Sequence, residues 1–158
     1  MLSYQYLDDV AISDLAFEAR GDTPKEMFEA AARALTEAMA DIKQVRPRVE
    51  KTIRLTHEAM DQLLFDWLAE LIYLKDAESL LFSQFQVDLS AVPAQAGLPA
   101  GQAGLTAQTA WRLVGNVRGE SIDPKRHSLH LDVKAVTYHL FEVAQKDGQW
   151  VARVVLDI

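Results

Sequence analysis

Residues 57–75, HEAMDQLLFDWLAELIYLK, decide the fold of this chain. Their apolar side chains recur with the 3.6-residue period of an α-helix and form one wide apolar face. Such a face is stable only when it packs against another layer, and its width suits a β-sheet. The face is formed by Leu63, Leu64, Trp67, Leu68, Leu71 and Leu74.

Both neighbours of this helix have the pattern of a β-strand. Residues 49–56 alternate, with Ile53 and Leu55 facing inward and Arg54 outward. Residues 80–89 begin as an apolar run and then alternate. The helix is therefore predicted to follow one strand and to precede another.

A second helix is predicted from residue 24 to about residue 41. Thr23 can cap its N-terminus, Pro24 suits its first position, and Glu26 completes a capping box. Its apolar stripe has helical spacing and is expected in the core. The stripe consists of Met27, Phe28, Ala31, Leu35 and Met39.

The remaining patterns predict an α+β fold. Six or more strands with two good helices indicate a single domain with an antiparallel sheet or sandwich. Residues 90–108 are rich in Ala, Gly and Pro and carry no charge, so we expect a long loop or a hairpin excursion there. The further strand patterns cover residues 4–7, 14–19, 110–118, 129–143 (as one strand or two) and 150–158, with turns expected at Asp8-Asp9 and at Lys146-Asp147-Gly148.

Composition narrows the function classes. The 158 residues are 49% hydrophobic, which suits one domain with a substantial core. There is no cysteine, no signal-peptide pattern and no apolar stretch near the ~20 residues of a membrane span, so a cytoplasmic protein is expected. The net charge of -7 argues against direct nucleic-acid binding and favours a protein partner or a cation.

Four carboxylates lie where predicted elements end. Asp14 opens a strand, Asp41 follows the first helix, and Asp157 ends the last strand beside the α-carboxylate of Ile158. Each also has an ordinary explanation as a turn, cap or terminal residue. Aspartates that converge repel one another unless a cation or a basic partner joins them, so convergence would imply such a ligand.

Common catalytic motifs are absent from the sequence. It contains no phosphate-binding glycine-rich loop, no nucleophile elbow and no zinc-binding histidine spacing. A metal-dependent hydrolase remains an alternative, with His139 as its only candidate for a general base.

Several segments together resemble the archease family. The resemblance spans nearly the whole chain, and its most specific parts are the Lys-Ala-x-Thr-Tyr-His run and the terminal Leu-Asp-Ile. The segments, in order, are residues 12–21, 39–41, 64–74, 80–83, 133–139 and 156–158.

The resemblance implies a protein that assists an RtcB-type RNA ligase in tRNA splicing or RNA repair and is not itself an enzyme. It would speed formation of the ligase–guanylate intermediate and promote turnover. The family's metal site matches Asp14, Asp157 and the carboxylate of Ile158, with Asp41 as a further functional acidic residue. Oxygen-only ligands favour Ca²⁺, Mg²⁺ or Mn²⁺ over zinc or copper. Ca²⁺ is the cation that we expect, with Mg²⁺ or Mn²⁺ as alternatives. The rival interpretation is a general folding modulator, or chaperone-like module, that uses the 90–108 loop and exposed apolar surface in place of the acidic site.

Overall fold

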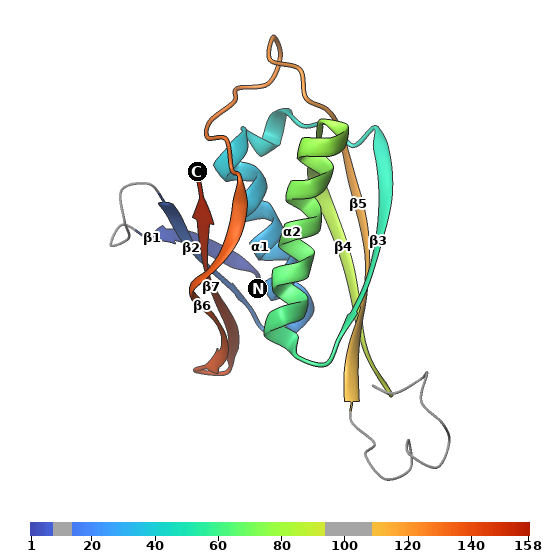
Figure 1. The fold of residues 1–158 in the computed structure, drawn as a ribbon, viewed down its shortest axis with the longest axis vertical. Helices are drawn as coiled ribbons and strands as arrows, with labels where there is room; N and C mark the ends of the chain where they lie inside the picture. Colours follow the sequence, from blue (N-terminus) through green and yellow to red (C-terminus); the bar gives the residue numbers. More distant parts are fainter. Residues whose placement is uncertain (8–13, 94–108) are drawn as a thin grey trace.

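Two helices lie between two antiparallel sheets in the computed structural model, which describes residues 1–7, 14–93 and 109–158 (Figure 1). One sheet has the strand order β1-β2-β7-β6 and the other β3-β5-β4. This arrangement confirms the predicted α+β class. The strands are β1 Ser3–Leu7, β2 Asp14–Gly21, β3 Val49–His57, β4 Leu80–Pro93, β5 Thr109–Ser121, β6 Ala135–Lys146 and β7 Gln149–Asp157; the helices are α1 Pro24–Met39, the short 3₁₀ helix η1 Ile42–Gln44, and α2 Met60–Glu78.

Helix α1 begins as predicted. The hydroxyl of Thr23 accepts a hydrogen bond from the Glu26 N–H at 3.3 Å, and Pro24 is the first helical residue. The Glu26 carboxylate accepts from the N–H of Asp22 at 3.0 Å, one residue earlier than in a capping box. All five residues of the predicted stripe are buried, which confirms that this helix belongs to the core.

Helix α2 begins three residues later than predicted because β3 continues to His57. Its six predicted face residues are all buried, as expected. Trp67 is fully buried, and its indole N–H donates to the carbonyl of Phe28 at 3.1 Å. This bond satisfies the buried indole and ties α2 to α1.

The predicted loop at 90–108 begins too early. β4 continues to Pro93, and Ser90 to Pro93 pair with the first residues of β5. The sequence suggested a loop because the Ala and Pro of this stretch have low strand propensity, yet pairing with β5 holds it extended. Residues 94–108, and the turn predicted at Asp8-Asp9, lie outside the described residues.

The predicted strand at 129–143 is wrong in its first part. β6 begins only at Ala135, and residues 122–134 form a β5–β6 connection that crosses the end of α1. The N–H groups of His130 and Leu131 donate to the carbonyls of Met39 and Ala38. They therefore satisfy the open end of a helix and cannot join a sheet ladder.

The final hairpin is confirmed. Asp147 and Gly148 have φ values of 53° and 78°, so both residues of the turn are left-handed. Two left-handed residues match the twist of the flanking strands in a two-residue hairpin. Within the three described ranges, no helix is long and apolar enough to cross a membrane.

Candidate functional site

The first sheet brings two of the predicted acidic residues together. Asp14 is the first residue of β2, Asp157 is the last residue of β7, and the two are direct partners in the antiparallel ladder. Direct partners in such a ladder have their side chains on the same face, with Cβ atoms about 5 Å apart. The two carboxylates therefore share one end and one face of the sheet.

That face is opposite the one that packs on the core. Leu15 and Leu156, the residues next to the two aspartates, pack on or within the hydrophobic core. Like charges in direct opposition destabilise an antiparallel pair. No ion pair among the described residues includes either aspartate. A bridging cation would turn this repulsion into attraction.

The main chain around Asp157 is fixed on both sides. β2 pairs with it on one side, and on the other it is opposite Ala135, the first residue of β6. The N–H of Lys134 donates to the Asp157 carbonyl at 2.8 Å. Ile158 follows directly, with its side chain partly buried against the core. The predicted third ligand thus follows directly on the facing pair.

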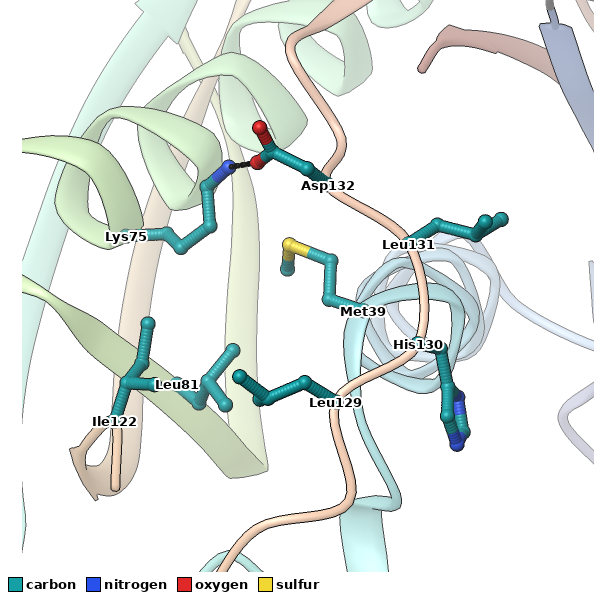
Figure 2. A pocket seen from close by; sticks show the side chains of 8 residues that line it. All are labelled: Met39, Lys75, Leu81, Ile122, Leu129, His130, Leu131 and Asp132. Atoms are coloured by element: carbon teal, nitrogen blue, oxygen red, sulfur yellow. Dashed lines mark hydrogen bonds and ion pairs between the residues drawn. The ribbon is translucent and has the colours of Figure 1, made fainter. Parts of the chain in front are cut away.

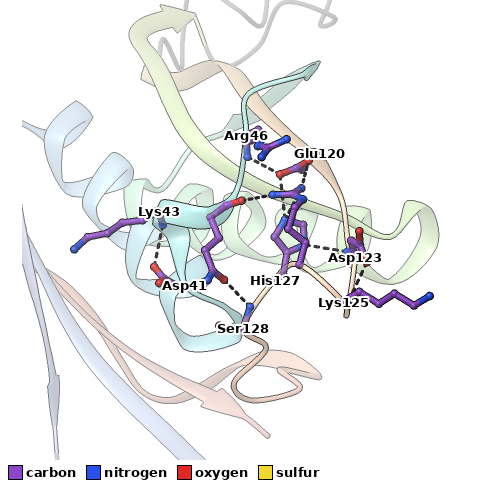
Figure 3. Close-up of polar contacts among 10 residues, drawn as sticks. Asp41, Lys43, Arg46, Glu120, Asp123, Lys125, His127 and Ser128 are labelled. Atoms are coloured by element: carbon purple, nitrogen blue, oxygen red, sulfur yellow. Dashed lines mark hydrogen bonds and ion pairs between the residues drawn. The ribbon is translucent and has the colours of Figure 1, made fainter.

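Asp41 has a different setting, shown in Figure 3. It caps η1 by accepting a hydrogen bond from the Lys43 N–H at 3.0 Å, and its own N–H donates to the Ser128 carbonyl at 3.1 Å. No hydrogen bond or ion pair in the described chain joins Asp41 to Asp14 or Asp157. Its link to the pair runs through the β5–β6 connection, which contacts Asp41 at its middle, through Ser128, and Asp157 at its end, through Lys134.

The chemistry of the donor set fits a hard divalent cation. Within the described ranges, no three His, Cys, Asp or Glu side chains are grouped closely enough to hold a metal ion. The predicted set differs from such a group because its third donor is a main-chain carboxylate. The side chains of Asp14 and Asp157 are in register, as such a site requires. The metal site at Asp14, Asp157 and Ile158 stays a prediction. His139 is exposed and belongs to no such group.

A buried ionic cluster escaped the sequence reasoning. Glu120, at 7% exposure, forms an ion pair with Arg126, a hydrogen bond with the ring of His127, and accepts from the Arg46 N–H (Figure 3). Because the Asp123 N–H donates to His127 Nδ1 at 2.9 Å, the proton of this imidazole is on Nε2, facing Glu120. The only signal in the sequence was the short basic run at residues 125–127.

The groups around Glu120 keep its carboxylate ionised. Burial raises the pKa of its carboxyl group, but hydrogen bonds from Arg126, the Arg46 N–H and His127 outweigh burial. The net result lowers the pKa of Glu120 to about 2. The cluster holds the start of the β5–β6 connection against the segment after η1.

A second polar contact holds the far end of this connection. Lys75 of α2 donates to the Asp132 carboxylate at 3.0 Å (Figure 2). It also donates to the Val133 carbonyl at 2.6 Å. Desolvation lowers the pKa of this ammonium, but its contacts with Asp76 and Asp132 raise it above the ordinary value overall. Lys75 therefore stays charged although it is buried.

Comparisons with known proteins place this geometry in context. Residues 4–158 match the Archease protein family. The archease of Methanopyrus kandleri is 36% identical over 146 residues, covering 92% of this chain and 94% of its own. The archease of Methanothermobacter thermautotrophicus is 35% identical over 158 residues, the full length of both chains.

Two solved structures have a similar fold. The solution structure of protein 1598 from Methanobacterium thermoautotrophicum has a TM-score of 0.75, with 30% identity over 98% of each chain. An archease from Thermotoga maritima, described as a possible chaperone, has a TM-score of 0.57 and 17% identity, covering 94% of this chain and 93% of its own. Because the identity is only 17%, this similarity is evidence for the fold alone.

Proposed function

Because this chain belongs to the archease family, we propose that it is a protein cofactor of an RtcB-type RNA ligase and not an enzyme. It promotes formation of the ligase–guanylate intermediate and ligase turnover, and so supports tRNA splicing or RNA repair in the cytoplasm. The chain acts through contact with the ligase and does not join RNA itself.

The observation that supports this proposal most strongly is that Asp14 and Asp157 are direct partners in the antiparallel ladder of β2 and β7. Two carboxylates that face each other in an antiparallel ladder lower the stability of the protein. A function of these two residues would explain why the chain has them at these positions. Both residues belong to segments through which the chain resembles its family.

The proposed ligands of a divalent cation are Asp14, Asp157 and the α-carboxylate of Ile158. Hard oxygen donors favour Ca²⁺, Mg²⁺ or Mn²⁺ over zinc or copper. The proposed ion is Ca²⁺, with Mg²⁺ and Mn²⁺ as alternatives. A bound ion would neutralise the facing carboxylates and hold the ends of β2 and β7 in one geometry. Asp41 is a further acidic residue of this function, placed by its cap on η1.

The charge of the chain supports a protein partner over RNA. The net charge of -7 disfavours the approach of a nucleic-acid backbone and favours a basic surface. The RNA substrate therefore binds to the ligase, and this chain contacts the ligase.

A guanylylation assay tests the proposal. The cognate ligase, GTP and Mn²⁺ are combined with wild-type protein, with Asp14→Asn, or with Asp88→Asn as a matched control from an exposed position of β4. Wild type and the control should accelerate ligase guanylylation, whereas Asp14→Asn should lose at least tenfold of the stimulation. A folded Asp14→Asn protein that stimulates like wild type would exclude this site.

The rival function is a general folding modulator. It is favoured by exposed apolar side chains such as Tyr138 and Leu140. Suppression of aggregation of unrelated unfolded proteins, with no effect on ligase guanylylation, would support the rival and overturn the proposal.

A further inference from the structure

We infer that Lys75 is a positioning residue that holds the β5–β6 connection between the two acidic parts of the proposed site. The inference rests on the proposed function, because Asp41 and Asp157 acquire their role there. Lys75 lies on α2 and touches neither aspartate, so it acts through residues 122–134.

The connection is bonded to both acidic positions. The Ser128 carbonyl accepts from the N–H of Asp41 at 3.1 Å, and the N–H of Lys134 donates to the carbonyl of Asp157 at 2.8 Å. A seven-residue segment, 128–134, therefore spans from one acidic residue to the other. A shift of this segment would change the position of Asp41 relative to Asp157.

Apolar packing alone does not fix the middle of the connection. Leu129 and Leu131 are 48% and 41% exposed. A cavity of about 280 Å³ lies beside them, lined also by Met39 and Leu81 (Figure 2). Because both leucine side chains are about half exposed and border a cavity, they bury little apolar area and contribute little to fixing the segment.

Polar contacts therefore hold this segment. Its start is held by the Glu120 cluster, and its middle by the hydrogen bonds of His130 and Leu131 to the end of α1. At its far end Val133 is buried, and the carbonyl of this residue accepts from Lys75.

The burial of Lys75 and the contacts of its ammonium group suit this positioning role. It is 9% exposed, and its ammonium contacts three oxygens, those of Asp132, Asp76 and the Val133 carbonyl. An ammonium has three N–H donors, so all of them have a partner. Removing the ammonium would leave a buried carbonyl unpaired and release Asp132, whose side chain is 81% exposed.

The test compares Lys75→Met with Lys75→Arg, which keeps the charge and the donors. Lys51→Met is the matched control, because Lys51 forms a more exposed ion pair with Glu78 of the same helix. Hydrogen exchange is measured at the amide of Lys134 and at a core amide of α1, Leu35. Ca²⁺ affinity is measured by isothermal titration.

We expect Lys75→Met to speed exchange at Lys134 at least tenfold beyond any change at Leu35, and to weaken Ca²⁺ binding at least tenfold. Lys75→Arg should restore both, and Lys51→Met should change neither. Equal slowing or speeding at both amides, with unchanged Ca²⁺ affinity, would make Lys75 merely structural and overturn the inference.

Two further outcomes are separable. If Lys75→Met does not fold, Asp132→Ala removes one anchor at an exposed position, and unchanged exchange at Lys134 in that variant overturns the inference. If the wild type binds no Ca²⁺, the metal part of the proposed function fails, while exchange at Lys134 still decides whether Lys75 positions the connection.

Discussion

The facing pair of Asp14 and Asp157 makes a prediction at the scale of one residue. Asp14→Asn removes one negative charge and keeps the shape, so the free energy of unfolding without metal should rise by about 0.5 kcal/mol. The same change should weaken Ca²⁺ binding at least tenfold. Thermal unfolding with a chelator and with Ca²⁺ measures both effects. A variant that is less stable without metal, yet binds Ca²⁺ like wild type, would contradict the prediction.

Glu120 makes a second prediction, for stability. Removing its charge by Glu120→Gln leaves Arg126 without its buried partner, which should lower the free energy of unfolding by about 3 kcal/mol near neutral pH. The matched control is Glu142→Gln, from an exposed ion pair with Lys146, which should cost less than about 1 kcal/mol. Urea unfolding at pH 6 measures the difference.

The effect of pH follows from the direction of the Glu120 shift. Folding lowers the pKa of Glu120 from 4.5 to about 2. The unfolded chain therefore binds the proton first as pH falls, so the stabilisation is full above about pH 4.5 and is lost toward pH 2. The difference between wild type and Glu120→Gln should shrink from pH 6 to pH 3. A difference that stays constant over this range would contradict the assignment.

The elements that the sequence predicted best are those with local signals. Helix α1 follows from Thr23 and Pro24, and α2 from the spacing of Leu64, Trp67 and Leu71, because helical contacts join residues three or four apart. The start of β6 could not be predicted in this way. The N–H groups of residues 130 and 131 bond to the end of α1, which is remote in sequence.

At the scale of an element, the segment between β4 and β5 should tolerate shortening. Replacing residues 94–107 with about six Gly and Ser residues leaves both strands as described and changes the closure entropy by under about 1 kcal/mol. Urea unfolding should show a similar midpoint, and ligase stimulation should persist. Loss of stimulation in a stable protein would move the functional surface onto this segment and favour the folding-modulator function.

The whole molecule explains why the candidate site was only partly predictable. Asp14 and Asp157 are 143 positions apart, from 157 − 14, and they meet only because β2 lies beside β7 in the sheet. Strand order depends on non-local pairing, which alternation within one strand does not encode. Two further contacts are non-local: that of Glu120 with the Arg46 N–H, and those of Lys75 with Asp132 and Val133.

The position of a tag, at one end of the chain or the other, tests whether the α-carboxylate of Ile158 is a ligand. A ligand from the α-carboxylate of Ile158 requires that no residue follows, because a peptide bond turns that carboxylate into a neutral carbonyl. A C-terminal tag should therefore leave the fold intact, since Val154 to Leu156 keep their buried packing, yet weaken Ca²⁺ binding at least tenfold and reduce ligase stimulation.

An N-terminal tag is the matched control, because Met1 is 86% exposed and precedes the edge strand β1. That form should bind Ca²⁺ and stimulate the ligase like the untagged chain. Isothermal titration of the two tagged proteins with Ca²⁺ and Mn²⁺ compares them directly. Equal affinities would remove Ile158 from the proposed ligands and leave the facing carboxylates of Asp14 and Asp157 as the whole protein contribution to the site.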